Sequence, residues 1–431
     1  MRQTWALASW APDMKSRLGL MMFLQFFVWG GWFVTMGSYL GASLSASGAQ
    51  IALAYSTQSW GAIVAPFIFG LVADRYFNAE RVLAVSHLAG GALLILLARQ
   101  AAFTGFMPLL LVYMILYMPT LALVNSISFR QLQDPAREFA AIRVWGTLGW
   151  IVAGLCISYV FAWDSPQSLA AGGLRNTFTM CGIASVLLGL YSLTLPRTPP
   201  VVGSSGRSGL RELLGLDALR LLANRNFLVF FVSSILICIP LAFYYQDANQ
   251  FLTELRLPNA TAKQTLGQMS EVAFMLLIPT FLKRWGMKTT LLVGMLAWAV
   301  RYLLFSLGNA GDLTVLLLIG IALHGVCYDF FFVSGQIYID SKAGPHIKSA
   351  AQGLITLATY GAGMLIGFWA AGQLTDHYAL AGVHDWRSIW QWPAAFAALV
   401  FVVFALTFRN ESVRYESPVS RKAKRLATTG K

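Results

Sequence analysis

Charged side chains are scarce in this chain. Of its 431 residues, 57% are hydrophobic and 11% are charged, whereas a soluble domain carries about 25% charged residues. Cysteine is also rare. The four cysteines lie within or at the ends of apolar runs, without a CxxC pair, at positions 156, 181, 238 and 327. This placement is typical of small core residues rather than of metal ligands. A Walker A loop and a dinucleotide fingerprint are both lacking, which argues against an ATP-driven pump and predicts no cofactor.

Long apolar runs take up most of the chain. A run of roughly 17–25 residues can cross the hydrocarbon core of a bilayer as a helix, and lipid cannot satisfy the backbone of an open structure. The sequence therefore predicts an all-α membrane protein. Twelve spanning helices are expected, at 18–43, 49–73, 82–99, 106–130, 138–163, 175–195, 226–252, 263–284, 289–308, 312–341, 348–374 and 388–409.

The basic residues are unevenly distributed between the two sides of these spans. Most of the 31 Lys and Arg residues fall on the side that holds both termini, while the other loops carry only Arg99, Arg175, Arg256, Lys263 and Arg387. By the positive-inside rule, both termini are cytoplasmic. The net charge of +13 and the basic tail are then interpreted as contacts with membrane lipid rather than with nucleic acid. Residues 1–17 do not resemble a cleavable signal.

A Pro-, Gly- and Ser-rich stretch at 196–225 predicts a linker between two six-helix halves. The expected domains are 1–195, 226–409 and a basic cytoplasmic tail, 410–431. The segment from Gly70 to Arg81 resembles the cytoplasmic loop signature of the major facilitator superfamily. Asp74, Arg75 and Arg81 would then hold the halves in one conformational state, although an ordinary charged loop has the same composition.

Four ionisable residues lie inside apolar runs: Arg143, Glu271, Arg301 and Asp329. A charge in a spanning helix costs about 2.5–3.5 kcal/mol on insertion scales, so such residues usually face a polar cavity. In the fifth span, Arg143, Thr147 and Trp150 are at i, i+4 and i+7 and share one face. That face offers hydrogen-bond donors and an aromatic surface to a flat polar ligand. Gly146 and Gly149 lie on or beside it and are expected to allow another helix to approach closely. The alternatives are snorkelling of Arg143 to the cytoplasm and an interfacial role for Trp150.

The eighth span carries a second polar stripe, Gln264, Gln268 and Glu271, again at i, i+4 and i+7. A carboxyl group removed from water can take up and release a proton. The alternative is a permanently neutral glutamic acid that bonds a neighbouring helix.

Asp329 in the tenth span and Arg301 in the ninth are expected to form an ion pair between adjacent helices, either as a coupling element or as a static packing contact. His324 lies five residues before Asp329 and is a further candidate for proton coupling. Other polar residues that could line a cavity are Gln25, Asn125, Tyr245, Gln246, Asp247, Asn249, Gln352, Thr356 and Tyr360.

Several separate motifs closely resemble the bacterial nucleoside:H+ symporters of the major facilitator superfamily. They occur in order from about residue 19 to 408 and include Phe23–Trp32, Ile142–Gly149, Gly267–Glu271 and Cys327–Phe331. The resemblance implies proton-driven nucleoside uptake across the inner membrane. It places functional positions of the family on Arg143, Thr147, Gln268, Glu271, Tyr328 and Asp329. Trp150 stands where the family has another aromatic residue.

The seventh span departs from the pattern of that family. Two amide positions used for ligand contact correspond here to Ala242 and Tyr245, and Gln246 or Asp247 could compensate. The resulting hypothesis is a monomeric, proton-coupled transporter of nucleosides that works by alternating access in the bacterial inner membrane, and is not an enzyme. The expected ligand residues are Arg143, Thr147, Trp150, Gln268, Glu271, Tyr328, Asp329, Tyr245 and Gln246. The expected coupling residues are Glu271, Asp329, Arg301 and His324. The alternatives are a symporter of sugars, oligosaccharides or other hydroxylated solutes and, more remotely, a non-transporting membrane sensor.

Overall fold

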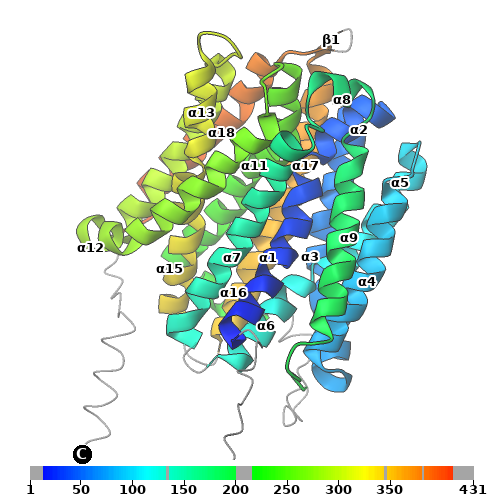
Figure 1. The fold of residues 1–431 in the computed structure, drawn as a ribbon. Coiled ribbons are helices and arrows are strands. Elements are labelled where there is room, and N and C mark those ends of the chain that lie inside the picture. Colours follow the sequence, from blue (N-terminus) through cyan, green and yellow to red (C-terminus); the bar gives the residue numbers. More distant parts are fainter. Residues whose placement is uncertain (1–12, 133–134, 200–215, 344–346, 381–382, 411–431) are drawn as a thin grey trace, which may run out of the picture.

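The computed structural model describes residues 13–132, 135–199, 216–343, 347–380 and 383–410. Within these ranges the backbone alone is described at 65–76, 135–137, 216–217, 348–349 and 380. The described chain is almost entirely helical (Figure 1). The exception is a short antiparallel pair, β1 (Ala379–Leu380) and β2 (Val383–His384).

The first half of the chain forms one group of helices. In order they are α1 (Met14–Phe33), α2 (Met36–Leu44), α3 (Gly48–Tyr76), α4 (Ala79–Leu97), α5 (Phe103–Tyr117), α6 (Thr120–Gln131), α7 (Pro135–Leu155), the π-helical turn η1 (Cys156–Val160), α8 (Pro166–Ala170) and α9 (Arg175–Ser192).

The second half follows a short 3₁₀ helix, η2 (Leu216–Ala223). Its elements are α11 (Arg225–Glu254), α12 (Ala260–Leu307), α13 (Thr314–Ala322), α14 (His324–Tyr328), η3 (Asp329–Val333), α15 (Ser334–Lys342), α16 (Lys348–Thr356), η4 (Leu357–Gly363), α17 (Met364–His377) and, after the β-pair, α18 (Trp386–Thr407). Both η3 and η4 are π-helical turns within otherwise α-helical spans.

Nine helical segments of the described chain are long and apolar enough to cross a membrane. One of them, α12, consists of two helices joined at Gly286, whose φ of 75° and ψ of 175° are not helical. The long helices α3 and α9 lie where the sequence predicts the second and sixth spans. The all-α prediction is confirmed, and the described segments agree with the twelve predicted spans in their order.

Local sequence signals set several helix ends. Asp13 caps α1 by accepting a hydrogen bond from the backbone of Ser16 at 2.8 Å. Ser47 and Gln50 form a reciprocal capping box at the start of α3. Pro119 stands between α5 and α6, where proline removes a backbone donor and interrupts the helix.

Two glycines permit the close helix pairs that carry the candidate site. In α7, Gly149 lies directly against the backbone carbonyl of Phe23 in α1, so any side chain there would collide with backbone. In α14, Gly325 lies against α12, where a Cβ would be 2.5 Å from the backbone nitrogen of Glu271. Small residues allow such approaches in membranes. The predicted close approach at Gly149 is confirmed.

The two ends of the helix bundle carry different elements. The upper end in Figure 1 holds α2, α8, α13 and the β-pair. The lower end holds the start of α1, the end of α6 and the start of α16.

Candidate functional site

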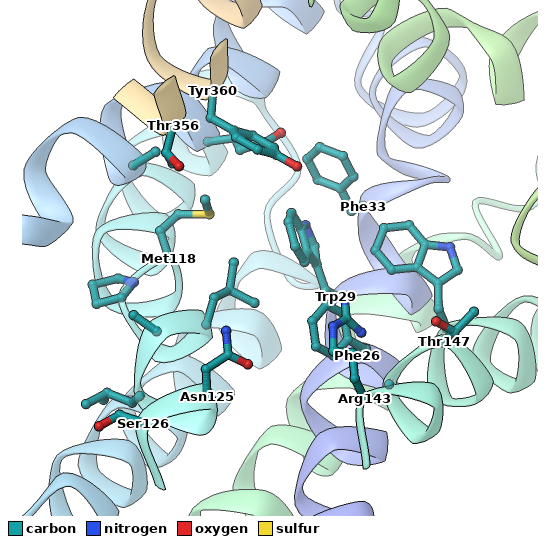
Figure 2. A pocket seen from close by; sticks show the side chains of 18 of the residues that line it. Phe26, Trp29, Phe33, Met118, Asn125, Ser126, Arg143, Thr147, Thr356 and Tyr360 are labelled. Carbon is teal, nitrogen blue, oxygen red and sulfur yellow. The ribbon is translucent and has the colours of Figure 1, made fainter. Parts of the chain in front are cut away.

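A cavity of about 640 Å³ lies between the two halves of the molecule. Its wall is formed by α1, α3, α4, α6 and α7 from the first half and by α11, α12, α14, α16 and η4 from the second. Figure 2 shows the side chains around this space, with Arg143 near Phe26 and Trp29 and with Asn125 on a separate part of the wall. The volume falls in the range of about 300–1,000 Å³ typical of small-molecule sites.

The cavity extends toward the lower end of the molecule. Its wall there includes residues from the loops that follow α3 and α9 and from the end of α6, namely Phe77, Thr198, Pro199 and Arg130. The upper end is closed by contacts between the halves. Ser38 of α2 donates a hydrogen bond to Asn249 of α11 at 2.6 Å. Among the described residues, the site is therefore closed at the upper end and open toward the lower one.

The first half contributes the stripe predicted for the fifth span. Arg143, Thr147 and Trp150 all line the cavity, so the predicted common face is confirmed. The Arg143 guanidinium lies 4.0 Å from the centre of the Phe26 ring, and its Nη1 is buried without a hydrogen-bond partner among the described residues. Arg143 thus turns into the cavity instead of snorkelling away.

An aromatic wall stands beside this stripe. Trp150 packs edge-to-face on Trp29, with ring centres 5.7 Å apart, and Phe33 packs in the same way on Tyr245 at 5.8 Å. Trp29 and Phe33 belong to α1 and Tyr245 to α11, so the wall runs from one half into the other. The aromatic contribution of α1 to this wall was not predicted from the sequence. The signal was available, because Phe26, Trp29 and Phe33 are at i, i+3 and i+7.

The second half contributes an acid, an amide and three phenols. Gln268 and Glu271 of α12 line the cavity, as predicted. The hydroxyl of Tyr328 lies 3.1 Å from that of Tyr360. The carboxyl group of Glu271 and the guanidinium of Arg143, one from each half, thus border the same space and carry opposite charge when both are ionised.

Two predicted ligand residues do not lie on the wall. Asp329 is fully buried, and both of its carboxyl oxygens lack a hydrogen-bond partner among the described residues. Gln246 is also fully buried, and its backbone carbonyl packs against Gly37 of α2. Each follows a tyrosine that does line the cavity, Tyr328 and Tyr245. Successive helical residues differ by about 100° in direction, and here that turn directs Asp329 and Gln246 away from the side that their tyrosines face.

The predicted ion pair between Arg301 and Asp329 is wrong. The Arg301 guanidinium instead lies 3.3 Å from the centre of the Tyr244 ring, and its Nη1 is 3.0 Å from Nδ1 of His324. Arg301 is fully buried and does not line the cavity, whereas His324 does. Arg301 therefore positions the imidazole of His324 through a hydrogen bond, without itself lining the cavity.

The other polar candidates divide into lining and packing residues. Asn125, Thr356 and Tyr360 line the cavity. Gln25 bonds Thr120 and His87 at 2.7 and 2.8 Å, within the first half. Gln352 is hydrogen-bonded to the backbone of Gln336 and does not line the cavity.

Of the predicted conformational loop, Arg81 is exposed in the first turn of α4. The side chains of Asp74 and Arg75 lie outside the described residues.

A fold of two helical halves around a central, one-sided cavity defines a secondary transporter. A model of the family described as Nucleoside H+ symporter matches residues 13–413, and the chain belongs to that family. It is 42% identical to YegT of Escherichia coli, over 92% of this chain and 94% of that protein. It is 32% identical to the nucleoside permease NupG of Escherichia coli, over 93% of this chain and 97% of that protein.

Solved structures agree with this assignment. Two crystal structures of the nucleoside transporter NupG, each 31% identical in sequence, match with TM-scores of 0.85 and 0.83. They cover 92% and 93% of this chain and all of the NupG chain. The predicted major facilitator fold and nucleoside:H+ symporter family are thereby confirmed. Because the family consists of transporters, the expectation that the chain is not an enzyme is confirmed as well.

Proposed function

We propose that this protein imports nucleosides together with protons by alternating access. The observation that carries the proposal is the pairing of two polar stripes across one cavity. Arg143, Thr147 and Trp150 from the first half meet Gln268 and Glu271 from the second. A ligand held by both stripes couples the halves, which is what a rocking mechanism requires.

Each side chain has a role that suits a nucleoside. Trp150 stacks on the base, because an indole offers a large flat surface to any base. Arg143, Thr147 and Gln268 supply hydrogen bonds to polar atoms of the base and sugar. Glu271 accepts hydrogen bonds from the ribose hydroxyls.

Protons are assigned to the acids of the second half. Asp329 follows the cavity residue Tyr328 and is the first residue of the π-helical turn η3. Turns of this type are frequent at functional sites. Glu271 and Asp329 interact electrostatically, so a proton on one affects the other.

The orientation follows from the basic residues. With the Lys- and Arg-rich side cytoplasmic, the cavity opens to the cytoplasm and its upper end faces outward. Both termini are then cytoplasmic, in the bacterial inner membrane. Relatives named for nucleoside transport support the substrate class, among them a xanthosine permease of Escherichia coli that is 34% identical over 91% of this chain and 95% of that protein.

Uptake of labelled uridine, adenosine and xanthosine into transporter-deficient cells tests the proposal. We expect accumulation that a protonophore abolishes. Competition by free ribose and by disaccharides separates nucleosides from the sugar alternative. If the folded protein takes up none of these nucleosides, the substrate class is wrong. If uptake ignores the protonophore, the proton coupling is wrong.

A further inference from the structure

Asp247 of α11 is a buried acid that the candidate site does not use. It is fully buried, and both of its carboxyl oxygens lack a hydrogen-bond partner among the described residues. The side-chain amide of the adjacent Gln246 acts on this carboxyl group, but it too makes no hydrogen bond among the described residues. Burying an ionised, unpaired carboxylate costs several kcal/mol, far more than burying the neutral acid. The structure as it stands therefore suits the protonated form of Asp247.

The neighbouring hydroxyl groups are committed elsewhere. Tyr55 of α3 and Tyr302 of α12 both interact electrostatically with Asp247. The Tyr55 hydroxyl donates to the carbonyl of Phe33 at 2.9 Å, and the Tyr302 hydroxyl donates to that of Pro240. Neither proton is free to stabilise a carboxylate at Asp247. Thr375 of α17 also faces Asp247 but donates its hydroxyl to the carbonyl of Ala371 at 2.8 Å.

A line of polar side chains leads from Asp247 to the upper surface. Asp247, Gln250 and Glu254 are at i, i+3 and i+7 and lie along one face of α11. Gln250 donates to Glu254 at 2.9 Å. The Glu254 carboxylate also lies 3.0 Å from Nδ1 of His384 and accepts a bond from the indole of Trp386 at 2.7 Å.

The outer end of this line is in contact with solvent. The side chains of His384 and Glu254 are 16% and 29% exposed, and His384 borders a separate surface depression of about 480 Å³. The hydrogen bond to Glu254 raises the pKa of His384 above its ordinary value, although burial opposes this. Asp247 and Asp376 also raise the pKa of His384, as Glu254 does.

Asp247 also stands at the seam where the two halves close. On the same stretch of α11, Asn249 bonds Ser38 of α2, and the amide of Gln250 lies against Gly41 of α2. Tyr55 brings α3 of the first half to Asp247 itself. Separation of the halves at this end would admit water to the carboxyl group.

We propose that Asp247 is a proton-binding site whose occupation is required for the outer end of the transporter to close. In the open state the hydrated carboxylate of Asp247 accepts one proton from the outer solvent, forming an O–H bond on one oxygen. Closure then buries a neutral acid. Glu254 and His384 form the charged rim beside this site. The inference rests on the proposed proton coupling, for which it supplies the step that links an external proton to a change of conformation.

The test measures closure directly, without any substrate. A cysteine is placed at Val34, which lines a small cavity of about 20 Å³ on the closed side of Trp150 and Tyr245. The native cysteines are removed, the protein is reconstituted in liposomes, and modification by an impermeant maleimide from outside is followed against external pH. The rate is divided by that of an exposed loop cysteine to remove the pH dependence of the reagent.

Acidification is expected to slow the corrected modification by up to about tenfold per pH unit, the limit for one linked proton. Asp247→Asn, which stays neutral, should show slow modification at all pH values. Asp247→Glu should restore the dependence on pH. Asp312→Asn is the matched control, because Asp312 is an exposed acid in the upper loop between α12 and α13.

Two results would overturn the inference. One is an unchanged pH profile in Asp247→Asn. The other is closure that depends on sodium at constant pH, which would make Asp247 a metal-cation site. Infrared difference spectra of the purified protein add an independent readout, since the band of a protonated carboxyl should disappear in Asp247→Asn and persist in Asp312→Asn. Because neither measurement uses a nucleoside, an error in the proposed substrate would show only in the uptake assay.

Discussion

At the scale of single residues, the contribution of each cavity side chain to ligand binding can be measured by a single substitution. Trp150 of α7 lines the cavity. Trp145, five residues earlier on the same helix, does not line it and is 48% exposed. The two tryptophans therefore offer a test of stacking against general effects of removing an indole.

Trp150→Ala should weaken nucleoside binding, whereas Trp150→Phe should largely preserve it. Stacking of a base on an aromatic ring contributes roughly 1–3 kcal/mol, so the dissociation constant should rise by about five- to 150-fold in the alanine variant. Calorimetric titration of the purified protein measures this change. Trp145→Ala is the control, and an equal loss in both variants would contradict the stacking role.

Glu271→Gln should reduce nucleoside affinity and proton-driven accumulation together. The amide keeps the size of the side chain but cannot ionise, and it replaces a charged acceptor by a neutral one. Hydrogen bonds to charged groups contribute about 1.5–3 kcal/mol, which corresponds to roughly ten- to 150-fold in affinity. Equilibrium binding and pH-gradient-driven uptake are measured side by side. Wild-type behaviour in both would make Glu271 a packing residue.

The residue types of the candidate site could be predicted from the sequence, but the directions of some of their side chains could not. The spacing of Arg143, Thr147 and Trp150 within one helix was sufficient to predict their common face, because that face depends only on helix geometry. The partner of Arg301 was not predictable, because it depends on how α11, α12 and α14 rotate against one another. Tyr244, one residue before the cavity residue Tyr245, takes the place expected for Asp329.

At the scale of helices and loops, glycine and proline positions were informative because their effects are local. Gly149 was predicted to allow close helix approach, and the break of α12 at Gly286 falls between the predicted eighth and ninth spans. The π-helical turns η1, η3 and η4 were not foreseen. A π-turn changes the hydrogen-bond register of a helix without a distinctive residue such as proline, so hydropathy does not reveal it.

The β-pair loop is anchored to α11 by His384 and Glu254. The raised pKa of His384 means that the folded protein favours the protonated imidazole. The stabilisation is therefore fully present below the ordinary pKa of about 6.5 and is lost as pH rises through the raised value. Because both side chains are partly exposed, the effect should not exceed about 1 kcal/mol.

His384→Gln should remove this dependence on pH. The difference in melting temperature between wild type and His384→Gln is expected to be largest at acidic pH and to shrink toward alkaline pH. Thermal unfolding of the purified protein over a series of buffers measures the difference. His377→Gln serves as the control, since His377 lies near the same surface, at the end of α17, and takes no part in the pair of His384 and Glu254. A constant difference across the series would exclude the ion pair as its cause.

At the scale of the whole molecule, two carboxylates join the halves at the upper end in matching ways. Asp376 of α17, in the second half, accepts hydrogen bonds from the backbone nitrogens of Gly48 and Ala49, at 2.5 and 2.8 Å. These nitrogens begin α3 in the first half. Asp164, in the first half, accepts from the backbone nitrogen of Thr261 at 3.0 Å, at the start of α12 in the second half.

Each half thus supplies an acid to a helix N-terminus of the other. The first backbone N–H groups of a helix have no partner within the helix, and the helix dipole favours a negative charge there. Ser158 extends the second contact, because its hydroxyl donates to Asp164 at 2.6 Å and accepts from the backbone of Ala262 at 2.9 Å. In the proposed alternating-access cycle both contacts break when the upper end opens, so they stabilise only the state in which that end is closed.

Replacing both acids should shift the protein toward the outward-open state. If each contact contributes about 1 kcal/mol, Asp164→Asn with Asp376→Asn should raise the ratio of outward-open to inward-open molecules by roughly thirtyfold, and each single variant by about the square root of that factor. Spin labels on the upper ends of α2 and α18 report the separation of the halves by pulsed electron resonance. Because the two contacts are far apart in sequence and bridge the same seam, their effects should multiply. A double variant no more open than either single one would contradict this expectation, because the second contact would then contribute nothing once the first is removed.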